Sequence, residues 1–189
     1  MSKKRPEMFN KKASKPKYKA DQIMETLALK PGQVIADIGS GGGYFTYRFA
    51  KAVGDKGKVY AMDTNQEFLA FIKNQATEQG LTNIVTWFTA SEHPDLPKHT
   101  FDYIFLRNVT HHLPNRINYF QRLKETLKPD GKIVIIEYDE RGGFFSFHKF
   151  HRHFVPQNIL LEEMKQAGYS IQKSYDFLSE QSFMIFTMA

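Results

Sequence analysis

The sequence contains no cysteine. This absence excludes disulfide bonds, cysteine metal ligands and any mechanism that uses a cysteine nucleophile. The sequence also lacks a run of about 18 apolar residues, so it predicts no membrane-spanning helix. Its N-terminus is basic and has no apolar signal core, which argues against export. We therefore expect a cytoplasmic protein.

The formal net charge of +6 is placed unevenly along the 189 residues. Residues 1–20 hold eight basic side chains against one acidic side chain, Glu7, so they carry +7 and the remaining chain carries −1. This pattern predicts a flexible basic tail over residues 1–17, followed by a single domain over residues 18–189. Such a tail can attract phosphate groups or anionic lipid, although many basic leaders only aid solubility.

Buried-strand patterns alternate with helical patterns along the chain, which predicts an α/β fold with a mostly parallel, doubly wound sheet and helices on both faces. Beyond the fifth strand come another helix and two strands joined by a short turn, and two strands joined so closely must be antiparallel. Seven strands are therefore expected, with an antiparallel C-terminal hairpin. The expected strands are 34–38, 58–62, 83–88, 101–106, 132–137, 169–177 and 182–188; the helices are 18–29, 44–53, 67–79, 115–127 and 156–167; and a turn is expected at 128–131.

A glycine-rich turn follows the first expected strand. Asp37 begins a D-x-G-x-G-x-G pattern whose glycines are Gly39, Gly41 and Gly43. Ligands of open α/β sheets bind beyond the carboxyl ends of the strands, and glycines let them approach the main chain. The dinucleotide pattern G-x-G-x-x-G would require glycine where Tyr44 stands, and Asp37 would repel a pyrophosphate. An acid at this place favours a cationic ligand.

Asp63 ends the second expected strand. A carboxylate at this place can accept hydrogen bonds from both hydroxyls of a ribose. Together with the glycine turn, it predicts an adenosyl ligand with a positively charged amino-acid end, which describes S-adenosylmethionine (SAM). Two alternatives remain: the glycines form only a tight connection, or Asp63 caps the next helix, with Thr64 and Asn65 as competitors.

Five segments follow one another along the chain: Val34–Gly43, Asp63, Phe101–Phe105, His111–Pro114 and Leu127–Gly131. In this order and spacing they resemble the motifs of the class I SAM-dependent methyltransferases, closest in pattern to the ubiquinone/menaquinone-biosynthesis C-methyltransferases. The resemblance covers roughly residues 20–140 and implies a Rossmann-like seven-stranded fold. It also implies a methyltransferase (a transferase of the EC 2.1.1 type) that uses SAM, releases S-adenosylhomocysteine and needs no metal.

The resemblance also implies roles by position. Asp63 would hold the ribose and Thr64 would lie beside the adenine. The register of the adenine-edge loop is open by two residues, so Ala90, Ser91 and Glu92 are all included. Arg107 would end the fourth strand near the sulfonium. The residues around the methionine part would be Asp37, Gly39, Ser40, Gly41 and Gly43.

His111 follows the fourth strand and is the candidate catalytic base, with His112 as the alternative. The competing interpretation is that both histidines belong to a structural loop. A second cluster, residues 144–154, alternates aromatic and cationic side chains. It would form a lid over an aromatic or anionic substrate, a metal site through its histidines, or the packing face of a surface helix.

The missing motifs narrow the methyl acceptor. Cytosine C5 methylation needs a cysteine nucleophile, and methylation of the adenine amino group usually relies on Asn-Pro-Pro after strand four, where this chain has Leu106–Val109. A small-molecule acceptor is therefore favoured. The alternatives are an RNA-modifying methyltransferase guided by the basic tail and a non-catalytic SAM-binding protein.

Overall fold

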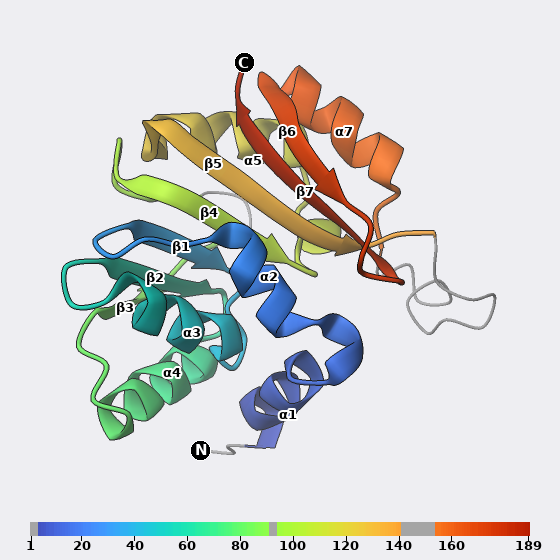
Figure 1. Ribbon diagram of the computed structural model, residues 1–189. Helices are drawn as coiled ribbons and strands as arrows, with labels where there is room; N and C mark the ends of the chain where they lie inside the picture. Colours follow the sequence, from blue (N-terminus) through green and yellow to red (C-terminus); the bar gives the residue numbers. More distant parts are fainter. Residues whose placement is uncertain (1–3, 91–93, 141–153) are drawn as a thin grey trace. The chain divides into compact units, whose positions relative to one another are not determined.

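The computed structural model describes residues 4–90, 94–140 and 154–189 (Figure 1). The chain divides into two units, Met1–Ala90 and Ser91–Ala189. Within the described residues, no helix is long and apolar enough to cross a membrane.

The first unit is built on three parallel strands in the order β3-β2-β1. Four of the five residues of β1 are buried, as expected for a parallel strand that is covered on both faces. Asp37 pairs with Ala61, and Asp63 pairs with Phe88, so both acids lie toward the carboxyl ends of their strands. The strands are β1 (Val34–Ile38), β2 (Lys58–Asp63) and β3 (Ile84–Phe88).

Two helices of the first unit, α3 and α4, pack against these strands as crossover connections. The buried side of α3 is aromatic and includes Phe45 and Phe49. Asn83 ties the end of α3 down, because its side-chain amide donates to the carbonyl oxygens of Ala50 and Gly54 at 2.8 and 2.9 Å. The helices of this unit are α1 (Lys4–Ala13), the 3₁₀ helix η1 (Pro16–Tyr18), α2 (Ala20–Leu27), α3 (Tyr44–Val53) and α4 (Gln66–Glu78).

Residues 4–13, which lie in the stretch 1–17 that the sequence predicts to be a flexible tail, form the helix α1 in the structure. Two apolar residues of this helix, Pro6 and Ala13, are buried, whereas its basic side chains are exposed. The charge pattern of the sequence indicates the exposed basic face of this helix, but it does not indicate that Pro6 and Ala13 are buried. The chain continues through η1, in which Tyr18 is buried.

The second unit contains four strands in the order β4-β5-β7-β6. β4 and β5 are parallel, and β7 runs antiparallel to both β5 and β6. The predicted antiparallel C-terminal hairpin is therefore confirmed. The elements are β4 (Phe101–Arg107), η2 (Thr110–His112), α5 (Arg116–Leu123), η3 (Lys124–Thr126), β5 (Leu127–Tyr138), α7 (Gln157–Gln166), β6 (Tyr169–Tyr175) and β7 (Gln181–Met188).

Strand β5 begins five residues earlier than predicted. Phe101 pairs with Leu127, but Tyr103 pairs with Lys132, so the expected turn at 128–131 is an irregularity inside the strand. Gly131 fits there because a Cβ atom at this position would lie 2.7 Å from the carbonyl oxygen of Phe101. The Pro-Asp-Gly sequence thus marks a bulge rather than a chain reversal.

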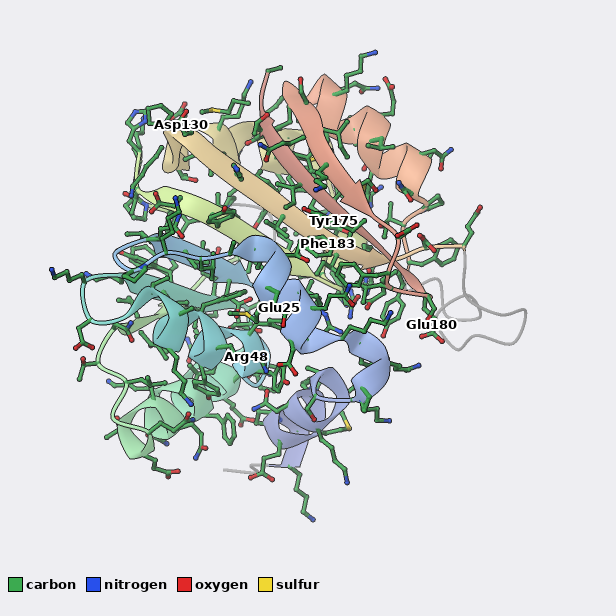
Figure 2. All side chains as sticks on the ribbon, in the orientation of Figure 1. Glu25, Arg48, Asp130, Tyr175, Glu180 and Phe183 are labelled. Carbon is green, nitrogen blue, oxygen red and sulfur yellow. The ribbon has the colours of Figure 1, made fainter. Side chains whose placement is uncertain are left out.

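An aromatic group closes the hairpin end of the second unit. Figure 2 shows Tyr175 and Phe183 close together, and their ring centroids are 4.9 Å apart on the paired strands β6 and β7. Phe177 packs edge-on against Phe183 at 5.6 Å. Such aromatic cross-strand pairs help to fix the register of a hairpin.

Candidate active site

The glycine turn between β1 and α3 is fixed to the end of β2. Gly39, Gly41 and Gly43 have φ angles of 71°, 55° and 83°, a region that side-chain-bearing residues rarely adopt. The backbone N–H groups of Gly39 and Ser40 both donate to the carbonyl oxygen of Met62 at 2.9 Å, and Ser40 Oγ donates to it at 3.1 Å. The predicted pattern therefore forms a fixed main-chain loop.

The three glycines of this turn differ in exposure and packing. Gly39 is exposed and Gly41 is half-buried, so both lie nearer the protein surface than Gly43, which is buried. Gly43 instead faces the interior, because a Cβ atom there would lie 2.8 Å from the Tyr47 ring and 2.9 Å from Ile72. Gly43 therefore allows close packing of the turn, whereas Gly39 and Gly41 lie nearer the surface.

Asp37 lies near the end of β1 with 4% of its surface exposed. Thr46 Oγ1, in the first turn of α3, donates to Asp37 Oδ2 at 2.5 Å. A buried carboxylate needs such donors to offset its loss of hydration. The sequence reasoning missed Thr46, although a hydroxyl residue in the first turn of the following helix was a usable signal.

Asp63 joins the glycine turn to the beginning of α4. Its Oδ2 accepts from the N–H of Gly41 and its Oδ1 from the N–H of Asn65, both at 2.9 Å. Burial raises the pKa of Asp63 above its ordinary value, and the backbone donors of Gly41, Asn65 and Thr64 and the positive charge of Arg5 oppose this rise. Each carboxylate oxygen can accept a further hydrogen bond, which suits a pair of ribose hydroxyls.

Asn65 is the N-cap of α4. Its side-chain oxygen accepts from the N–H groups of Glu67 and Phe68 at 2.9 and 3.4 Å. The competing interpretation of Asp63 as the helix cap is therefore not needed. Thr64, between the two, is exposed.

The loop after β3 reaches Asp63 through the main chain. The N–H of Thr89 donates to the carbonyl oxygen of Asp63 at 3.3 Å, which brings the exposed Ala90 into this region. Ser91 and Glu92 lie outside the described residues. Phe88, the partner of Asp63 in the sheet, is 55% exposed and was not predicted as a site residue.

In the second unit, Glu137 on β5 is fully buried and binds His111. Its Oε1 lies 3.0 Å from His111 Nδ1 and accepts from the N–H of Tyr138 at 3.0 Å. Its Oε2 accepts from Thr110 Oγ1 at 2.5 Å and from the N–H of His111 at 3.3 Å. Because this carboxylate accepts from Nδ1, the Nδ1-protonated tautomer is favoured, and the basic lone pair is on Nε2.

Two further residues follow β4. Arg107 is its last residue and pairs with Ile136 on β5. Asn108 has a left-handed φ of 54°, its N–H donates to Ile136 at 2.8 Å, and its side-chain oxygen accepts from Gln181. This sharp bend directs the chain into η2, where the rings of His111 and His112 pack with centroids 4.1 Å apart and planes tilted by 49°.

A family model described as a methyltransferase domain matches residues 29–177. The chain belongs to this methyltransferase family. The methyltransferase family recognised from the sequence motifs is thereby confirmed.

Bacterial quinone-biosynthesis enzymes are among the relatives of this methyltransferase. The ubiquinone/menaquinone biosynthesis C-methyltransferase UbiE of Hydrogenovibrio crunogenus is 27% identical over 167 residues, which cover 83% of this chain and 61% of that enzyme. The enzyme of the same name from Shewanella frigidimarina is 31% identical over 120 residues, which cover 61% of this chain and 46% of that enzyme. The chain thus spans less than two thirds of the length of these relatives.

Solved methyltransferase structures share the fold. A SAM-dependent methyltransferase from Aquifex aeolicus matches with a TM-score of 0.84 at 22% identity, over 97% of this chain and 98% of that chain. A geranyl diphosphate methyltransferase in complex with SAM matches with a TM-score of 0.72 at 14% identity, over 90% and 83% of the two chains. The predicted Rossmann-like class, with seven mostly parallel strands and an antiparallel C-terminal strand, is confirmed.

The methyltransferase residues predicted from the sequence fall into both units. Gly41 and Asp63 are brought into direct contact in the first unit, and Ser40 is bound to the same strand end. Arg107 and His111 belong to the second unit. The aromatic and histidine cluster at 144–154 lies outside the described residues except for Phe154. Among the residues that are described, no group of three or more His, Asp or Glu side chains could hold a metal ion.

Proposed function

We propose that this methyltransferase moves the methyl group of SAM to a small-molecule acceptor and that His111 removes a proton from that acceptor. The observation that carries the base assignment is the contact between fully buried Glu137 and His111 Nδ1 at 3.0 Å. A buried carboxylate that orients one nitrogen of an imidazole leaves the other as the proton acceptor.

The donor half of the proposal rests on the first unit. The main chain of exposed Gly39 and half-buried Gly41 would lie against the methionine part, with Asp37 as the nearby acid, and Asp63 would accept the ribose hydroxyls. When bound there, SAM supplies a methyl group that is already activated on a positive sulfur. The protein must therefore mainly orient the reactants and exclude water.

The acceptor half rests on the second unit and on the relatives. Methylation of carbon, the reaction named for the UbiE enzymes, replaces a hydrogen, so a proton must leave the acceptor. We propose that this proton goes to His111 Nε2, and that Glu137 stabilises the resulting imidazolium. Thr110 holds the Glu137 carboxylate in place through its 2.5 Å hydrogen bond.

Calorimetric titration and a turnover assay test the proposal. We expect wild-type protein to bind SAM and S-adenosylhomocysteine, and to release S-adenosylhomocysteine with one acceptor from a panel of hydroxylated aromatics and quinols. Replacing His111 with Ala should lower kcat by about a hundredfold or more, because the acceptor then has no group to take its proton. Exposed His99 is the matched control, because His99→Ala should leave kcat unchanged.

Three outcomes contradict parts of this function. Absence of SAM binding by the wild-type protein would overturn the donor assignment. Binding without turnover on any acceptor would favour the non-catalytic alternative. A His111→Ala variant with unchanged kcat would show that the histidine has only a structural role.

A further inference from the structure

Helix α1 lies directly on the glycine turn. A Cβ atom at Gly42 would lie 2.2 Å from the carbonyl oxygen of Pro6 and 2.3 Å from Asn10 Oδ1, both on α1. Asn10 Nδ2 donates to the carbonyl oxygen of Gly42 at 2.7 Å. Gly42 is buried, in contrast to the exposed Gly39, so α1 covers one end of the turn and leaves the other open.

A second contact joins α1 to the beginning of α4, the helix that follows Asp63. Phe9 packs edge-on against Phe68 in the first turn of α4, with ring centroids 5.6 Å apart and an interplanar angle of 74°. The Arg5 guanidinium lies over the same ring, 5.5 Å from its centroid, and its charge opposes the rise in the pKa of Asp63. α1 therefore connects the glycine turn to the beginning of α4 and carries a positive charge near the acid between them.

Asn10 is not fully satisfied in this position. Among the described residues, no hydrogen-bond donor reaches Asn10 Oδ1, although this atom is buried. A buried acceptor without a donor costs free energy, so the other contacts of α1 must offset this cost when the helix docks.

We infer that α1 is a closing wall of the cofactor site and that Asn10 is the positioning residue that docks it on the glycine turn. This inference rests on the proposed binding of SAM at the turn. By linkage, a ligand that contacts the docked helix stabilises docking, and docking raises the affinity for that ligand by the same factor. The positive N-terminal segment is then a part of the methyltransferase site rather than a tail.

Two substitutions separate α1 from the turn without removing either element. Gly42→Ala places a methyl group where α1 lies, and the φ angle of Gly42 is not in the left-handed region, so alanine fits the backbone. This variant should bind S-adenosylhomocysteine about tenfold more weakly, because overpacked contacts separate. Asn10→Ala should weaken binding about fivefold through the loss of one hydrogen bond.

A double-mutant cycle on the full chain tests whether both substitutions act through docking. The Gly42→Ala, Asn10→Ala double variant should bind no more weakly than Gly42→Ala alone, because an undocked helix has no further contact to lose. In wild type, S-adenosylhomocysteine should slow tryptic cleavage at Lys11 and Lys12, and in Gly42→Ala it should not. Lys11→Ala, on the exposed side of α1, is the control and should leave the affinity unchanged.

The outcomes distinguish this inference from the proposed function. If wild-type protein does not bind S-adenosylhomocysteine, the donor site itself is wrong. If wild type binds it and both variants bind equally well, α1 is not part of the site. If Gly42→Ala binds more tightly, α1 obstructs the site rather than closing it. Additive losses in the double variant would also overturn the inference, because they would mean that Gly42 and Asn10 act separately.

Discussion

In the first unit, the candidate site is made mostly of main chain: three glycines with positive φ angles, backbone donors to Met62, and two backbone N–H groups on Asp63. In the second unit, the candidate base is held by side chains, because Glu137 binds Thr110 and His111. A site built from main chain depends on the backbone conformation of its residues, which suits a ligand that is the same for every member of the family. A side-chain site can change with one substitution, which suits the part of a methyltransferase that must match different acceptors.

The largest effect is expected for Glu137→Gln in the second unit. This variant should lower kcat without changing cofactor affinity, which would distinguish the role of the second unit from that of the first. In Glu137→Gln, the amide can donate to His111 Nδ1, so the favoured tautomer carries its proton on Nε2, where it cannot act as a base. We expect kcat to fall by about 10² to 10⁴, as for other groups that orient a catalytic histidine. The affinity for S-adenosylhomocysteine should stay the same.

The tautomer of His111 can be measured directly. Nitrogen NMR shifts should change from protonated Nδ1 in wild type to protonated Nε2 in Glu137→Gln, even before an acceptor is known. Glu140→Gln, an exposed acid three residues later, is the control and should alter neither kcat nor the shifts. Loss of cofactor affinity in Glu137→Gln would break the comparison, because the two regions would then not be functionally separate.

The next effect belongs to the first unit. Asp63→Ala removes the acceptor of both expected ribose bonds, and hydrogen bonds to a charged group contribute about 1.5–3 kcal/mol each. We expect the dissociation constant for S-adenosylhomocysteine to rise by about a hundredfold or more, as read by calorimetry. Asp55→Ala, an exposed acid in the same unit, should bind as wild type does.

The result for Asp63 needs one structural check. Because Asp63 also accepts from Gly41, its loss could loosen the glycine turn. A thermal melt without ligand measures this, and a variant that melts close to wild type but binds poorly supports direct ribose contact. Unchanged affinity in a folded variant would refute the ribose assignment.

The same contrast explains what the sequence could predict. The glycine turn and Asp63 follow local rules, because glycine spacing and strand ends are visible in short segments. The C-terminal hairpin also follows from a local rule, since a short turn forces its two strands to be antiparallel. By contrast, Glu137 and Thr110 are 27 residues apart, and no periodic pattern says which side chains meet across that separation.

Helix α1 shows the same limit at the N-terminus. Half of its ten residues are charged, and Pro6 lies among them, so composition favoured disorder. Its structure depends on a few contacts to Gly42 and Phe68, which are 32 residues or more away in sequence. Strand β5 differs for a related reason: Pro-Asp-Gly favours a turn locally, but pairing with β4 on both sides keeps it within the strand.

The smallest expected effect tests whether side-chain support also matters in the backbone-built site. Thr46→Val keeps the shape of the side chain but removes the hydroxyl that donates to buried Asp37. Losing a donor to a buried charged group should lower the free energy of unfolding by about 2 kcal/mol, measured by urea denaturation. Cofactor affinity should fall only slightly, because the turn is held mainly by its bonds to Met62 and Asp63. Thr82→Val, at an exposed position, is the matched control and should change stability little. If Thr46→Val instead abolished binding while the protein stayed folded, the orientation of Asp37 would decide recognition, and the first unit would depend on a side-chain network as the second unit does.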